Sequence, residues 1–76
     1  MKYCASIHYQ RSDMQLKDFQ TWSEVTDFLK RGLNPNVIRV YVYKFDSRGR
    51  ELMSRCVTMG NLIEVATAKT DKEALI

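Results

Sequence analysis

Apolar and polar residues alternate with period two at the N-terminal end of the chain. Within residues 2–10, the apolar side of this alternation consists of Tyr3, Ala5, Ile7 and Tyr9. Such a pattern predicts a half-buried strand. After turn-forming residues at 11–13, Met14 and Leu16 alternate with polar neighbours, so we expect a short second strand that completes a hairpin.

The next segment has helical periodicity and is expected to form a helix over residues 22–31. Thr21 and Glu24 have the spacing of a capping box. The apolar stripe of this helix comprises Trp22, Val25, Phe28 and Leu29. Gly32 suits the left-handed position after a helix, with Leu33 as its apolar partner, and Pro35 prevents continuation.

Residues 37–45 form the strongest predicted strand, and both of its faces are apolar. One face carries Ile38, Val40 and Val42, and the other carries Arg39, Tyr41, Tyr43 and Phe45. A strand that is apolar on both sides is expected at the centre of a sheet. One helix covers one side, so the other must be covered by the C-terminal tail, by a second copy or by a ligand.

The rest of the chain predicts a second hairpin and a short tail. Gly49 suits a turn at 46–50, and residues 51–59 return as the antiparallel partner. Residues 61–67 fit a helix or a strand equally well. We therefore expect an α+β fold with a small antiparallel sheet, ββαββ or βαββ, and one helix on one face. The domain covers residues 1–68, and residues 69–76 form a loosely held tail or a short C-terminal helix.

The composition is typical of a single folded domain, and it does not by itself indicate which kind of partner the domain binds. A chain of 76 residues that is 45% hydrophobic and 28% charged is not typical of disorder. The formal charge of +3 permits an anionic partner without requiring one. Cys4 and Cys56 are expected to be reduced thiols. Because no leader-like or membrane-spanning segment is present, the expected location is the cytoplasm.

The residues do not assemble a recognisable catalytic or metal site. His8, the single histidine, lies four residues from Cys4, which is about 13 Å along a strand and too far for a shared metal ion. Phosphate-binding glycine loops and nucleophile elbows are missing. We therefore expect a protein that is not an enzyme and that holds no cofactor and no metal.

The candidate binding residues lie on the second predicted hairpin. The set comprises Arg39, Tyr41, Tyr43, Phe45, Arg48, Arg50 and Arg55. Aromatic rings beside arginines are similar in outline to the platforms on which single-stranded nucleic acids stack. The same rings would equally serve as core, as a dimer interface or as a contact for another protein.

Two functional hypotheses follow. In size and kind the chain resembles small phage or mobile-element accessory proteins, such as anti-restriction and anti-CRISPR inhibitors, which implies non-catalytic binding to a larger protein. The alternative is a small nucleic-acid-binding regulator, although the consensus run of the RNA-recognition motif is missing. A homodimer through the aromatic strand is a third possibility, and a mimic of DNA is disfavoured because such proteins are strongly acidic.

Overall fold

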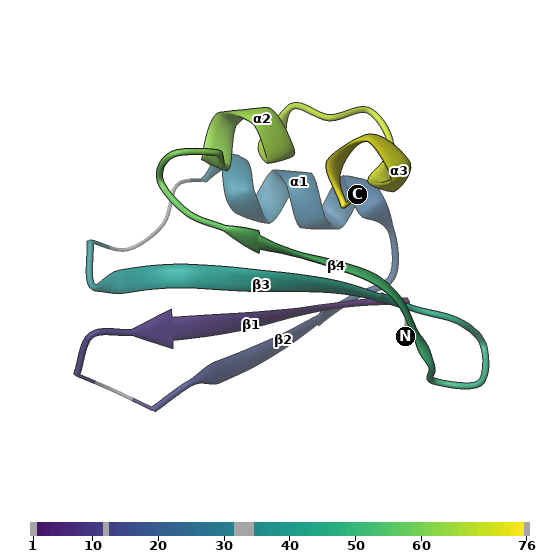
Figure 1. Cartoon of the computed structure of the whole chain (residues 1–76), viewed down its shortest axis with the longest axis horizontal. Helices are drawn as coiled ribbons and strands as arrows, with labels where there is room; N and C mark the ends of the chain where they lie inside the picture. Colours follow the sequence, from purple (N-terminus) through teal and green to yellow (C-terminus); the bar gives the residue numbers. More distant parts are fainter. Residues whose placement is uncertain (1, 12, 32–34, 76) are drawn as a thin grey trace.

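Within the described residues, four antiparallel strands form one sheet in the order β2-β1-β3-β4, and three helices cover one of its faces (Figure 1). The computed structural model describes residues 2–11, 13–31 and 35–75. Its elements are β1 (Tyr3–Tyr9), β2 (Gln15–Phe19), α1 (Trp22–Lys30), β3 (Val37–Phe45), β4 (Glu51–Val57), α2 (Leu62–Ala66) and α3 (Asp71–Ala74). The predicted α+β class and the ββαββ order are confirmed, and two short helices follow the second hairpin. None of the helices in the described residues has the length and apolar character needed to cross a bilayer.

Helix α1 begins where its capping residues predict. The Thr21 hydroxyl accepts a hydrogen bond from the Glu24 amide at 3.2 Å, and the Glu24 carboxylate accepts one from the Gln20 amide at 3.0 Å. These bonds satisfy donors that a helix N-terminus otherwise leaves unpaired. Val25 and Leu29 are buried against the sheet. The helix ends at Lys30, one residue earlier than expected, and the predicted cap at Gly32 and Leu33 lies outside the described residues.

The core lies between the helices and one face of β1, β3 and β4. Val40 and Val42 are fully buried there, as predicted. The prediction that Ile38 shares their face is wrong, because its side chain is 46% exposed. His8 pairs with Arg39 while Tyr9 pairs with Val37, so Ile38 is an extra residue in a β-bulge. A bulge changes the alternation, and it brings Val37 rather than Ile38 against the core.

The β3–β4 hairpin closes on Asp46 and Gly49. The Asp46 carboxylate accepts hydrogen bonds from the amides of Arg48 and Arg50 at 2.8 and 2.9 Å, and Gly49 has a φ of 81°. That backbone conformation favours glycine because a side chain at such a φ is strained.

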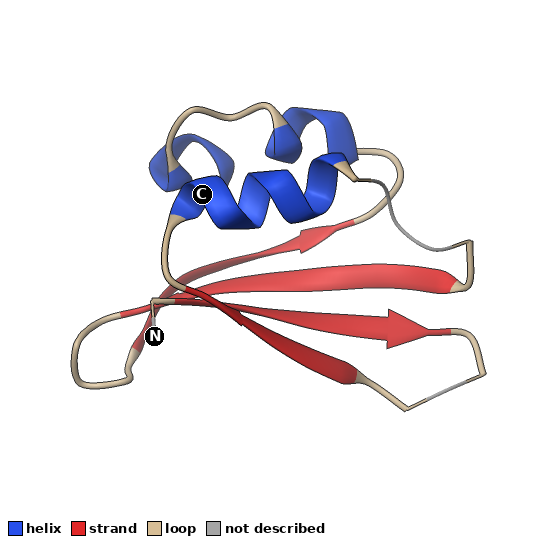
Figure 2. Ribbon diagram, turned by 180° about the vertical axis from the view of Figure 1, so that it is seen from behind, coloured by secondary structure: helices blue, strands red, loops and turns tan. Residues whose placement is uncertain are grey.

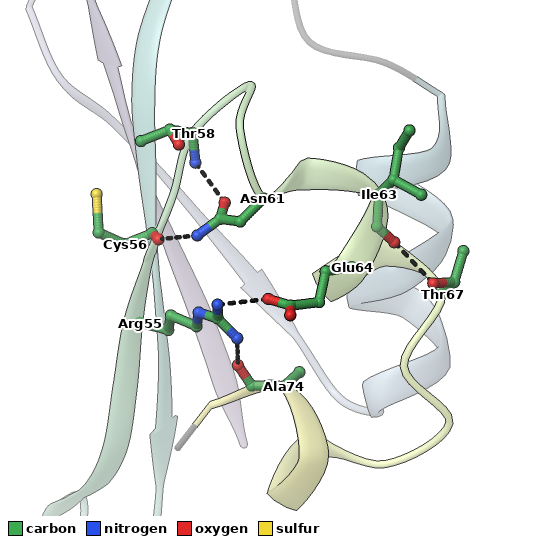
Figure 3. Close-up of polar contacts among 8 residues, drawn as sticks. All are labelled: Arg55, Cys56, Thr58, Asn61, Ile63, Glu64, Thr67 and Ala74. Atoms are coloured by element: carbon green, nitrogen blue, oxygen red, sulfur yellow. Dashed lines mark hydrogen bonds and ion pairs between the residues drawn. The ribbon is translucent and has the colours of Figure 1, made fainter.

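Strand β4 ends at Val57, two residues before the predicted end at 59. A turn follows the strand, and the Asn61 side chain folds back toward the end of β4. It accepts a hydrogen bond from the Thr58 amide and donates one to the Cys56 carbonyl (Figure 3). This turn redirects the chain, and the segment at 61–67 that fitted both patterns contains helix α2.

The C-terminal residues are packed, contrary to the expectation of a loosely held tail. Residues 71–74 form α3, which begins with the Thr70 hydroxyl accepting from the Glu73 amide. Ala74 and Leu75 are 1% and 2% exposed and belong to the core. The prediction failed because this segment contacts residues far away in the chain, such as Tyr3, which bonds to Asp71, and local patterning does not reveal such contacts. In Figure 2, this segment lies on the same side of the sheet as α1.

A polar network ties α3 to the sheet. The Asp71 carboxylate accepts from the Tyr3 hydroxyl at 2.6 Å and pairs with the Lys44 ammonium at 2.6 Å. Burial acts to raise the pKa of Asp71, but hydrogen bonds from Lys44 and Tyr3 and the Lys44 charge outweigh it, so this pKa is lowered. Burial, together with Asp71, raises the pKa of Tyr3 to about 12. The network therefore holds an ionised carboxylate between a neutral phenol and an ammonium.

We expect Leu75→Ala to destabilise the fold by about 2–5 kcal/mol, because it removes a fully buried side chain and leaves a cavity. Urea denaturation measures this loss. Leu52→Ala is the matched control, since Leu52 is 56% exposed, and its effect should stay within about 0.5 kcal/mol. Equal stability of the two variants would show that the C-terminal segment does not pack in solution.

We expect Asp71→Asn to lower stability by about 1–3 kcal/mol at neutral pH, because Lys44 loses its counter-charge. The folded pKa of Asp71 lies below the ordinary value of about 3.9, so its contribution is present above that pH. The contribution is lost as the pH falls through the lowered pKa. Denaturation of both proteins across this range should therefore show the difference shrinking, and a difference that stays constant down to low pH would contradict the prediction.

Candidate functional site

The face of the sheet opposite the helices is uncovered by any helix of the described residues, and we call it the open face (Figures 1 and 2). Directly paired residues of neighbouring strands share a face, so the register defines its members. They are Cys4, Ser6 and His8 of β1; Leu16 and Asp18 of β2; Arg39, Tyr41, Tyr43 and Phe45 of β3; and Glu51, Ser54 and Cys56 of β4.

Three aromatic rings follow one another along β3 on this face. The ring centroids of Tyr41 and Tyr43 are 6.4 Å apart with an interplanar angle of 28°, and those of Tyr43 and Phe45 are 6.2 Å apart at 29°. The spacing results from the strand itself, since alternate residues lie about 6.6 Å apart on one face. All three side chains are half-buried. We call this set the aromatic row.

Arg39 and His8 lie at the Tyr41 end of the aromatic row. The Arg39 guanidinium carbon is 5.9 Å from the centroid of the Tyr41 ring, and the His8 ring meets Tyr41 edge-on at 5.2 Å. The histidine is further positioned by the Ser6 hydroxyl, which lies 2.9 Å from its Nε2. Cation–π and edge-to-face contacts of this kind hold the first ring of the row in place.

The centre of the open face is uncharged. Burial, followed by the negative charge of Glu51, raises the pKa of Tyr43, so this phenol keeps its proton at neutral pH. Burial and the nearby Asp18 carboxylate likewise raise the pKa of the Cys4 thiol. A protonated thiol is a poor nucleophile. The centre therefore offers rings, hydroxyls and thiols to a partner, and its Cys4 thiol is a poor nucleophile.

The structure divides the predicted binding residues into three places. Arg39, Tyr41, Tyr43 and Phe45 lie together on the open face. Arg48 and Arg50 are exposed in the turn beyond its Phe45 end.

Arg55 lies on the opposite, helix-covered face, because it pairs in register with the core residue Val42. Its guanidinium donates to the Ala74 carbonyl at 2.9 Å and forms an ion pair with Glu64 (Figure 3). The arginine cluster expected from the sequence is therefore not a single patch. Arg55 fastens α2 and α3 to β4 and is not available to a ligand on the open face.

Two open-face residues escaped the prediction of binding residues. His8 contacts Tyr41 from β1, and the Leu16 side chain on β2 is 61% exposed. Alternation alone places both residues on a strand face. Only the order β2-β1-β3-β4 brings that face beside the aromatic row, and the order of strands is not a local property of the sequence.

A second feature lies between β2 and α1, where a surface hollow of about 260 Å³ is open to solvent. It is lined by Lys17, Asp18, Phe19, Glu24, Asp27, Phe28 and Arg31. The Lys17 ammonium lies 5.2 Å from the Phe28 centroid and 5.9 Å from that of Phe19. The chain thus places its own cation over these rings, which makes the hollow a weaker candidate than the open face.

Neither metal chemistry nor similarity to other proteins adds a candidate. Within residues 2–11, 13–31 and 35–75, no three His, Cys, Asp or Glu side chains are placed to hold a metal ion. Comparison with protein-family models, curated proteins and solved structures finds no significant match for this chain. What the open face binds is therefore inferred from its own geometry.

We expect Tyr43→Ser to cost about 1 kcal/mol of stability, because the ring is half-buried on a sheet surface. The adjacent Val42→Ser should cost about 3 kcal/mol or more, since it empties a buried site and buries a hydroxyl. Circular dichroism during urea denaturation measures both. A loss for Tyr43→Ser as large as that for Val42→Ser would mean that the aromatic row belongs to the core.

Proposed function

We propose that this chain is a non-catalytic protein-binding domain and that the open face is its contact surface. The observation that carries the proposal is the aromatic row, which lies on an uncovered sheet face whose centre is uncharged. Soluble proteins rarely leave such a surface without a partner.

The types of residue on the open face favour a protein partner. Tyr, Phe and Arg are enriched in protein–protein interfaces, where large rings supply apolar contact at a low cost in conformational entropy. Tyr41, Tyr43 and Phe45 provide such rings, and Arg39 borders them. Leu16 extends the apolar surface toward the β2 edge.

A nucleic-acid partner is favoured less. Binding along a phosphate backbone draws its affinity from several Lys or Arg contacts. On the strands of the open face, Arg39 is accompanied by two carboxylates, Asp18 and Glu51, and Arg55 is held on the other side. A domain with this face would act by occupying a surface of another protein, as an inhibitor or an adaptor does.

We expect the tagged protein to retain a protein partner from a lysate of the cells that make it, with or without nuclease treatment. The Tyr41→Ser/Tyr43→Ser variant should lose that partner, because the centre of the contact surface is removed. Arg31→Ala, an exposed change on the helix side, serves as the matched control and should retain it.

Two results would contradict the proposal. One is a partner that is retained equally by the double tyrosine variant and the wild-type protein. The other is retention that nuclease abolishes, together with a shift of a labelled oligonucleotide that weakens steeply with salt. The second result would establish the nucleic-acid alternative.

A further inference from the structure

The outer strands β2 and β4 each have an edge that pairs with no other strand of the described residues. Such an edge presents main-chain N–H and C=O groups to which a further strand can bind. At the end of β4, the Asn61 side chain donates to the Cys56 carbonyl, and a register shift beside Phe45 leaves Leu52 as an extra residue. Strand β2 instead keeps a regular register with β1 over all five of its residues. Its edge is therefore the better template for another strand.

The main-chain groups of Leu16 and Asp18 face this outer edge. In an antiparallel pair, residues whose N–H and C=O groups bind the neighbouring strand alternate with residues whose groups face away from it. The Phe19 carbonyl accepts from the Lys2 amide at 3.3 Å, so the main chain of Phe19 faces β1. Alternation then turns the main chain of Asp18 and of Leu16 outward. Because residues 15–18 are exposed, the edge offers two donors and two acceptors to an extended polypeptide.

The hollow between β2 and α1 lies beside the same edge, and Asp18 is part of its lining. Lys17 points to the helix side of the sheet, because it pairs in register with the core residue Ala5. A strand added to β2 would place alternate side chains on that side, next to Lys17. The rings of Phe19 and Phe28, whose centroids are 5.5 Å apart, line the hollow there. The edge and the hollow thus form one site for a backbone and a side chain.

The lining of the hollow favours an apolar side chain. The Lys17 ammonium lies 5.2 and 5.9 Å from the centroids of the two rings, so the place that a cation would take over them is filled. The carboxylates of Glu24 and Asp27 disfavour an acidic side chain. Ring surface and the aliphatic stem of Lys17 remain for contact. A large apolar side chain, aromatic or branched, is therefore the best fit.

We propose that the outer edge of β2 binds an extended segment of a partner protein, which adds a fifth strand to the sheet and places a large apolar side chain in the hollow between β2 and α1. In this mode of recognition, main-chain hydrogen bonds supply affinity and a pocket for a side chain supplies specificity. The edge site is separate from the aromatic row, because β1 lies between β2 and β3 and the hollow is on the helix side.

The probe is a library of random ten-residue peptides displayed on phage and selected against the purified domain. Enriched sequences should share a large apolar residue, and the corresponding synthetic peptides should bind in solution. Nuclear magnetic resonance then measures amide hydrogen exchange in the free and the bound protein. Exchange at the Leu16 and Asp18 amides should slow about tenfold or more on binding, because both become hydrogen-bonded.

Leu16→Pro removes one outward amide and leaves the bonds to β1 in place, since proline is tolerated on an edge strand where the N–H faces solvent. It should weaken peptide binding about tenfold. Leu16→Thr is the matched control, because it loses the same side chain and keeps the amide, and it should bind within about twofold of the wild type. Phe28→Ala, which removes ring surface from the hollow, should also weaken binding about tenfold. Circular dichroism checks that each variant is folded.

Three results would overturn the edge site. The first is a selection that enriches no peptide, the second is protection of amides on a different strand, and the third is equal binding by Leu16→Pro and Leu16→Thr. Where Leu16→Pro unfolds the chain, exchange at the two wild-type amides decides. The Tyr41→Ser/Tyr43→Ser variant should bind the peptides as the wild type does. Failure of the edge site therefore leaves the proposed function to be decided by the retention experiment.

Discussion

Strand β3 presents apolar side chains to both faces of the sheet, and the helices cover only one of them. Val40 and Val42 are fully buried beneath the helices, while Tyr41 and Tyr43, which alternate with them, stay half-buried on the other side. In the described residues, the helical layer consists of one nine-residue helix and two shorter ones. All of them lie on the same side of the sheet, so no helix covers the other face. The candidate interface is the direct consequence of this one-sided cover.

The C-terminal segment determines which face remains open. Asp71 accepts the Tyr3 hydroxyl and pairs with Lys44, both of which lie on the core side of their strands. Arg55 binds the Ala74 carbonyl from the same side. These polar contacts, together with the buried Leu75, hold the segment on the same side of the sheet as α1 (Figure 2). The residues that might have shielded the aromatic row are thereby committed to the helix layer.

The parts of the fold that follow from local chemistry could be predicted, and the parts set by distant contacts could not. Alternation identified both hairpins, and the Thr21 and Glu24 pair located the start of α1, because strand periodicity and capping act within a few residues. Ile38 was misplaced because a bulge depends on how β3 pairs with β1. Arg55 was assigned to a binding cluster because its facing partner, Val42, belongs to another strand.

The net charge of the protein is likewise not a guide to the charge of the open face. The chain is formally +3, yet the strands of the open face carry Arg39 against Asp18 and Glu51, a local balance of −1. Lys2, which directly precedes β1, brings that balance to zero. The positive charge therefore resides largely on the turns and the helix side. A ring-bearing face whose charges nearly cancel has little electrostatic attraction for the anionic partner that the net charge permits, so the net charge of the molecule reports little about what that face binds.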